Sequence, residues 1–84
     1  MAYSLRIKES AAKEIGALPK ADRERVVLAI DTLGKDPHQG AQLKGSATGL
    51  RRMRVGSYRI LFEVRKSELL ILVLRVGHRR DVYR

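Results

Sequence analysis

Three short segments near the end of the chain alternate apolar and polar residues, and only two residues separate each segment from the next. They cover residues 50–55, 58–65 and 68–76, with Gly56-Ser57 and Lys66-Ser67 between them. Alternation with a period of two is typical of half-buried β-strands, and two-residue loops connect antiparallel neighbours. Gly in first position favours a type II′ turn, whereas Lys-Ser is a poorer turn sequence. The sequence therefore predicts a three-stranded antiparallel meander.

Two-residue loops would also fix the pairing of the strands. In the first hairpin Arg54 would lie opposite Arg59. In the second, Arg65 would meet Glu68. Because side chains alternate between the two faces of a sheet, one face becomes almost entirely apolar and should receive the rest of the core. Its residues are Met53, Val55, Tyr58, Ile60, Phe62, Val64, Leu69, Ile71 and Val73.

The first half of the chain predicts one more strand and two helices. Residues 3–8 alternate like a half-buried strand. Ser10 is a suitable N-cap for a helix that ends near residue 18, and Pro19 suits the first turn of a second helix. Gly34 is well placed as the residue that ends the second helix.

Residues 35–49 are rich in Asp, Pro, Gln, Gly and Ser and are expected to form a loop. The expected fold is therefore α+β: an N-terminal strand, a two-helix hairpin and the meander, forming one antiparallel sheet with the helices on one face. A chain of 84 residues has room for one domain, residues 1–84.

Composition excludes several kinds of protein. The chain has no Cys and two isolated His, so neither disulfides nor a metal site is expected, and no cofactor is predicted. The longest apolar run, residues 69–74, is far too short to cross a bilayer. Residues 1–7 do not resemble a signal peptide. These features favour a cytoplasmic protein.

The positive charge is concentrated near the end of the chain. Residues 1–50 contain eight Lys or Arg against six Asp or Glu, whereas residues 51–84 contain ten against three, within a total of +9. Nine of those ten are arginines. Arginine binds phosphate with two parallel hydrogen bonds and stacks on bases, so this bias favours a nucleic-acid partner over simple solubility.

The predicted face opposite the helices combines arginines with leucines. Arg52, Arg54 and Arg59 lie at one end of it. A sheet covered by helices on one side should have a polar second face. The leucines therefore indicate a surface for a partner protein or for a second copy of the chain. They are Leu61, Leu70, Leu72 and Leu74.

Arginines, one histidine and one tyrosine together suit the cleavage of RNA. Guanidinium groups can orient a phosphodiester and stabilise the charge of its transition state, and His78 can move protons. The neighbouring 2′-hydroxyl of RNA supplies the nucleophile, so a metal is not required. Tyr83 could stack on a base or anchor the end of the chain, and the residues alone do not choose between these roles.

Two segments at this spacing resemble the RelE branch of the RelE/ParE toxin superfamily. The first is Leu50-Arg51-Arg52-Met53-Arg54-Val55-Gly56-Ser57-Tyr58-Arg59-Ile60, preceded by Leu43-Lys44-Gly45, and the second is Val76-Gly77-His78-Arg79-Arg80-Asp81-Val82-Tyr83. The resemblance covers essentially the whole chain. It implies a RelE-like fold and a prokaryotic toxin that enters the ribosomal A site and cuts mRNA without a metal, by 2′-hydroxyl attack that gives a cyclic phosphate.

The resemblance also implies roles for individual residues. The basic pair of the family falls on Arg52 and Arg54, its phosphate-binding arginine on Arg59, its next arginine on Arg79 and its terminal tyrosine on Tyr83. Together with His78 these are the predicted catalytic residues. The remaining arginines of the region are expected to bind RNA or the ribosome: Arg51, Arg75, Arg80 and Arg84. The four leucines named above would bind a RelB-like antitoxin, and mRNA and the 70S ribosome would be the other partners.

Some relatives have lysines in place of Arg52 and Arg54. Arginine stays protonated at physiological pH and is a poor general base, so we expect catalysis by positioning and charge, with His78 as the residue that could exchange protons. Two other functions remain open: a ParE-like inhibitor of DNA gyrase without nuclease activity, and a non-catalytic RNA-binding module.

Overall fold

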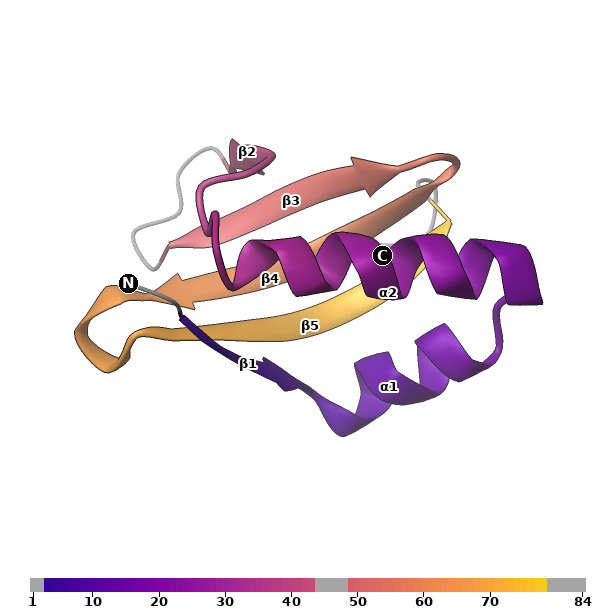
Figure 1. Cartoon of the computed structure of the whole chain (residues 1–84), viewed down its shortest axis with the longest axis horizontal. Coiled ribbons are helices and arrows are strands. Elements are labelled where there is room, and N and C mark those ends of the chain that lie inside the picture. The colour runs from indigo at the N-terminus through magenta and orange to yellow at the C-terminus, as the bar shows by residue number, and fades with distance from the viewer. Residues whose placement is uncertain (1–2, 44–48, 79–84) are drawn as a thin grey trace.

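The computed structural model describes residues 3–43 and 49–78. Within them the five strands form one sheet in the order β1-β5-β4-β3-β2, and both helices lie on one face of it (Figure 1). The predicted α+β architecture is confirmed. The elements in chain order are β1 (Ser4–Ile7), α1 (Glu9–Gly16), α2 (Lys20–Leu33), β2 (Ala41–Gln42), β3 (Leu50–Val55), β4 (Tyr58–Arg65), a 3-10 turn (Lys66–Glu68) and β5 (Leu70–His78).

The sheet is mixed, whereas the sequence predicted a fully antiparallel one. β1 pairs in parallel with β5, from Ser4 opposite Leu70 to Ile7 opposite Val73. Apolar alternation shows which face of a strand is buried but not the direction in which it runs. β2, which pairs with β3, lies in the predicted loop. A strand of two residues is too short to show a period, so no pattern of residues predicts it.

The helix ends differ from the predicted ones by small shifts with physical causes. α1 is preceded by Lys8 rather than by Ser10 as its N-cap, and Pro19 is the N-cap of α2 rather than part of its first turn. Gly34 does not take the left-handed conformation, since its φ is −61°. Its backbone instead lies against Tyr3: a Cβ here would be 3.3 Å from the Tyr3 carbonyl oxygen, and the Tyr3 N–H donates to the Gly34 carbonyl at 2.8 Å. A side chain at this position would make the contact with Tyr3 tighter than is usual.

The first hairpin has the predicted register, and the second does not. Arg54 lies opposite Arg59, and Gly56 has a φ of +59° while Ser57 has no positive φ, as a type II′ turn requires. The second connection is longer than two residues. A 3-10 turn is followed by Leu69 in the left-handed region, so Arg65 pairs with Leu70. A shift of two residues leaves the faces unchanged, because the period of a strand is two.

A β-bulge in β5 changes the faces farther along. Phe62 pairs with Val73, but the preceding residue of β4, Leu61, pairs with Arg75. Leu74 is therefore an extra residue, and the alternation of β5 reverses after it. Strict alternation, which the sequence predicted for this strand, is wrong beyond Leu74. The strand also begins two residues later than predicted and extends to His78.

The core lies between the helix hairpin and the covered face of the sheet. Phe62, Ile60 and Ile71 are completely buried, and each contributes roughly 1.5–3 kcal/mol by burial. Val55 and Tyr58 pack at its border. Leu69, a predicted core residue, is 38% exposed because it forms part of the turn. In the described part of the chain, neither helix has the length and apolar character needed to span a membrane.

Candidate functional site

Three arginines of the first hairpin share the face of the sheet that the helices leave open. Arg54 and Arg59 are directly opposite each other, and Arg52 lies two residues before Arg54. Met53 between them points into the core, so alternation turns the arginines to the other side. Arg52 and Arg54 are exposed and Arg59 is half-buried. The tight turn at Gly56 holds this arrangement.

A shallow hollow of about 210 Å³ lies beside these arginines, where β2 begins along β3. One wall is the backbone of Gly40, which has a φ of +73°. A Cβ at Gly40 would be 1.9 Å from the carbonyl oxygen of Arg52, so only glycine permits this approach. The hollow is lined by Gly40, Ala41, Arg52, Met53, Arg54 and Arg59. The structure thus brings together three of the predicted catalytic residues.

The charges at this site favour an anion. Guanidinium groups remain protonated at every physiological pH, and like charges directly opposite each other destabilise a sheet by up to about 1 kcal/mol. The Arg54–Arg59 pair therefore has a cost in the free protein. A bound phosphate would remove this cost and accept charge-assisted hydrogen bonds from the same groups.

His78 is at the same end of the sheet but on its other face. Because of the bulge, His78 pairs with Tyr58, and Gly77 is the partner of Arg59. The rings of Tyr58 and His78 are in edge-to-face contact, with centroids 6.2 Å apart and planes at 76°. Tyr58 belongs to the helix-covered face, so the imidazole points away from the face of Arg54 and Arg59.

Tyr58 is in turn bonded to α2. Its hydroxyl donates to the Asp22 carboxylate at 3.1 Å. Burial raises the pKa of Tyr58, and the hydrogen bond to Asp22 and the charge of that carboxylate raise this pKa further. Neither residue was among the predicted site residues. They are far apart in the sequence, and no motif links them.

Two arginines predicted to bind RNA make contacts within the protein. Arg51 donates to the backbone carbonyls of His38 at 2.7 Å, Gln39 at 3.3 Å and Gly40 at 3.2 Å, and so holds the segment before β2. The guanidinium of Arg75 is 3.2 Å from the carboxylate of Glu14. Both residues are half-buried, and a role in RNA binding stays a prediction. Arg79, Arg80, Tyr83 and Arg84 lie outside the described residues.

The four predicted antitoxin-binding leucines are half-buried rather than fully exposed. Charged residues lie opposite three of them: Arg52 opposite Leu61, Arg65 opposite Leu70, and both Glu63 and Arg6 opposite Leu72. Long charged side chains can cover apolar surface with their methylene groups. The fourth, Leu74, is the bulge residue.

Across residues 3–43 and 49–78, no group of three or more His, Asp or Glu side chains could hold a metal ion. The predicted independence from a metal stays a prediction, because it concerns the reaction rather than the free protein.

Comparison with known proteins assigns the fold to a family. A family model described as the ParE toxin of type II toxin–antitoxin systems, parDE, matches residues 5–83. The chain belongs to this toxin family. The toxin RelG of Mycobacterium tuberculosis is 31% identical over 86 residues, which cover 100% of this chain and 99% of RelG.

Solved structures of similar toxins agree with this assignment. The toxin of the RelBE2 toxin–antitoxin complex from Mycobacterium tuberculosis superposes with a TM-score of 0.83 at 27% identity, over 94% of this chain and 100% of that one. The archaeal RelE–RelB complex from Pyrococcus horikoshii gives a TM-score of 0.82 at 27% identity, over 98% and 100%. The predicted membership of the RelE/ParE superfamily is confirmed, and the chain is a RelE-like toxin of a type II toxin–antitoxin system.

Proposed function

We propose that this toxin is a ribosome-dependent endoribonuclease that cuts mRNA in the ribosomal A site and so inhibits translation. The observation that supports it best is the convergence of Arg52, Arg54 and Arg59 around one hollow on the open face of the sheet. A protein that only had to be soluble would gain nothing from two arginines held in direct opposition. Binding of a phosphodiester would explain this arrangement, because its negative charge would be stabilised by both guanidinium groups.

The proposed reaction uses a nucleophile that the RNA already contains. The 2′-oxygen attacks the adjacent phosphorus, and the bond between phosphorus and the 5′-oxygen of the next nucleotide breaks. The products are a 2′,3′-cyclic phosphate and a 5′-hydroxyl. One proton leaves the attacking hydroxyl and another reaches the departing 5′-oxygen, so the step is balanced without a metal.

The arginines would act on the charge that develops at the phosphoryl oxygens. Donors fixed in advance stabilise a transition state better than mobile water does. The register fixes the backbone positions of Arg54 and Arg59, and the adjacent pairing of β2 fixes that of Arg52. None of them is a general base. We therefore assign most of the rate enhancement to positioning and charge. His78, which lies on the other face at the same end of the sheet, would exchange protons only with RNA that passes around that end.

The partners follow from the same proposal. RNA and the 70S ribosome would meet the arginine face, with Arg79 and Tyr83 contributing from the end of the chain. The similar toxins from M. tuberculosis and P. horikoshii were solved as complexes with antitoxins. A cognate RelB-like antitoxin would cover Leu61, Leu70, Leu72 and Leu74, which remain partly exposed.

One observation favours a second function. The family model that matches this chain describes ParE toxins. A ParE-like protein would inhibit DNA gyrase by binding and would need no arrangement for cleaving a phosphodiester.

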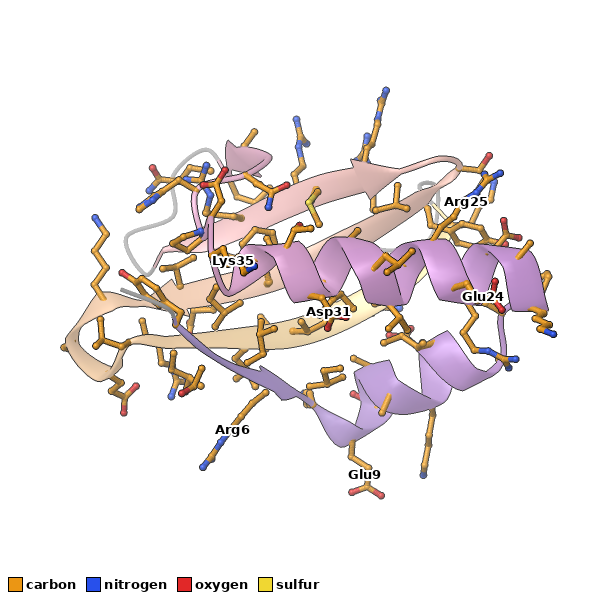
Figure 2. The ribbon with its side chains drawn as sticks, viewed as in Figure 1. Arg6, Glu9, Glu24, Arg25, Asp31 and Lys35 are labelled. Carbon is orange, nitrogen blue, oxygen red and sulfur yellow. The ribbon has the colours of Figure 1, made fainter. Side chains whose placement is uncertain are left out.

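Primer extension on a translated message, with and without ribosomes, separates these functions. Cuts in the reading frame that appear only with ribosomes support the nuclease, whereas intact message together with inhibited supercoiling by gyrase supports the alternative. Arg59→Ala and Arg54→Ala should abolish cutting. Arg6→Ala is the matched control, because Arg6 extends from β1 away from the rest of the molecule (Figure 2) and its loss removes the same charge. Equal effects of all three variants would contradict the proposed site.

A further inference from the structure

The end of β5 is connected to both helices by carboxylates. On α1, Glu14 accepts the N–H of Val76 at 3.0 Å and contacts the Arg75 guanidinium at 3.2 Å. On α2, Asp22 accepts the hydroxyl of Tyr58, whose ring contacts His78. β1 pairs with β5 only up to Val73, so Glu14 occupies the edge that β1 leaves open. These contacts surround the segment that ends at His78.

The bulge determines which neighbours His78 has. If the pairing of Phe62 with Val73 continued without interruption, Tyr58 would lie opposite Gly77 and His78 would be on the arginine face. The extra residue Leu74 moves His78 to the face of Tyr58. Glu14 satisfies the backbone N–H of Val76, two residues beyond the bulge, and so stabilises this register. The bulge at Leu74, stabilised by Glu14, therefore produces the contact between Tyr58 and His78.

We propose that Tyr58 is a positioning residue for His78, with Asp22 fixing the phenol ring that orients the imidazole. An exposed histidine at the end of a strand has several rotamers of similar energy. An edge-to-face contact with a ring that is itself hydrogen-bonded to a helix restricts this choice. An imidazole that exchanges protons needs one defined orientation, because proton transfer requires a hydrogen bond of correct geometry.

Part of this inference rests on the proposed nuclease activity, and part concerns only the free protein. The ring contact and its dependence on Asp22 exist without any substrate. Their effect on cutting exists only if His78 takes part in the reaction. The two parts can therefore be tested separately.

Nuclear magnetic resonance of the imidazole protons tests the first part in the isolated toxin. His38, the only other histidine of the chain, lies before β2 and serves as an internal control. Tyr58→Leu should move the His78 resonances toward the positions of an unstructured histidine and leave those of His38 unchanged. Tyr58→Phe and Asp22→Ala remove one hydrogen bond from its two ends, so both should move the His78 resonances in the same direction and by a smaller, similar amount.

Tyr3→Phe is the matched control for the loss of a hydroxyl, because Tyr3 packs on the same core but far from His78. Its backbone N–H donates to the Gly34 carbonyl, and the next residue, Ser4, donates to Leu69 just before the start of β5. This substitution should leave His78 unaffected. If Tyr58→Leu does not fold, Tyr58→Phe and Asp22→Ala still test whether the hydrogen bond between Tyr58 and Asp22 affects His78. Unchanged His78 resonances in both variants would overturn the role of Asp22, and unchanged resonances in a folded Tyr58→Leu would overturn the role of Tyr58.

Ribosome-dependent cutting tests the second part with a double-mutant cycle. Tyr58→Leu should lower the rate of cutting about 10- to 100-fold, as loss of precise orientation does, and Tyr58→Phe should retain most of it. In a His78→Ala background, Tyr58→Leu should cause no further loss, because residues that act through one another are not additive. Equal fold-losses in both backgrounds would show that Tyr58 acts independently of His78. If the wild-type toxin does not cut, the proposed function fails, while the resonances still decide whether Tyr58 orients His78.

Discussion

Arg54→Glu should make the free toxin more stable while it abolishes the activity. Arg54 and Arg59 lie directly opposite each other in adjacent antiparallel strands, so the substitution replaces a repulsive cross-strand pair with an attractive one. Cross-strand charge pairs contribute about 0.2–1 kcal/mol in either direction. The reversal should therefore raise the free energy of unfolding by roughly 0.5–1.5 kcal/mol. For a domain of this size the change corresponds to about 2–12 °C in Tm.

Arg6→Glu is the matched control for this experiment. Both substitutions lower the net charge of +9 by the same amount, and both act on exposed side chains of the same face of the sheet. Arg6, however, has an apolar partner, Leu72, opposite it. Arg6→Glu therefore reports the general effect of lower net charge, and the difference between the two variants isolates the cross-strand pair.

Urea unfolding at low salt and at 1 M salt measures the effect. The m-value should stay constant, because the surface exposed on unfolding does not change. At 1 M salt the Debye length is about 3 Å, so most of the gain of Arg54→Glu should disappear. The cutting assay on the same variants should show loss for Arg54→Glu and near-normal activity for Arg6→Glu. A loss of stability in Arg54→Glu, or a gain no larger than that of Arg6→Glu, would refute the reasoning.

Three other expectations concern the surroundings of the site. Gly40→Ala should destabilise the toxin by more than about 1 kcal/mol in urea unfolding, because its Cβ would be 1.9 Å from the Arg52 carbonyl oxygen at a φ of +73°. Gly16→Ala is the control and should not destabilise, because a Cβ at Gly16 would meet no atom within 4 Å. Glu14→Ala should lower the free energy of unfolding by about 1–3 kcal/mol and speed amide hydrogen exchange at Val76. Glu14→Gln keeps an acceptor, so it should have a smaller effect on both quantities. Equal exchange rates at Val76 in the wild type and both variants would mean that the hydrogen bond of 3.0 Å is unimportant. Subtracting the titration of Tyr58→Phe from that of the wild type gives the tyrosinate absorbance of Tyr58. This absorbance should appear at a higher pH than for an ordinary tyrosine, because burial and Asp22 raise the pKa of Tyr58. Since an unfolded tyrosine ionises near pH 10, the folded state then binds more protons, and stability should fall as the pH rises above about 10; a normal titration would contradict the bond to Asp22.

The hairpin that carries the arginines could be predicted from the sequence alone. Its register needed only the alternation of residues 50–65 and a glycine at the first position of the turn, and both are local properties. Arg54 opposite Arg59 was therefore foreseen, as was the burial of Ile60 and Phe62. The second turn was not, because Lys66-Ser67 is compatible with several loop lengths and the 3-10 turn with Leu69 in the left-handed region has no clear sequence signal.

The surroundings of His78 could not be predicted, because they depend on contacts between distant parts of the chain. The bulge at Leu74 reverses the faces of β5, and its register is stabilised by Glu14 on α1, about sixty residues earlier in the chain. Asp22 reaches Tyr58 only once α2 has packed across the sheet. The one local sign of the bulge is Arg75, which uninterrupted alternation after Ile71 and Val73 would place on the core face, where Val76 lies instead.

The sequence by itself determined the class of fold, the apolar face and the pair of opposed arginines, because each follows from the two-residue period of a strand and from the chemistry of a tight turn. The tertiary structure decided the direction of β1, the position of Gly40 against β3 and the face on which His78 lies. These depend on where a helix carboxylate or a loop backbone meets a strand edge. Such contacts are determined by the packing of the whole core rather than by the local pattern of residues.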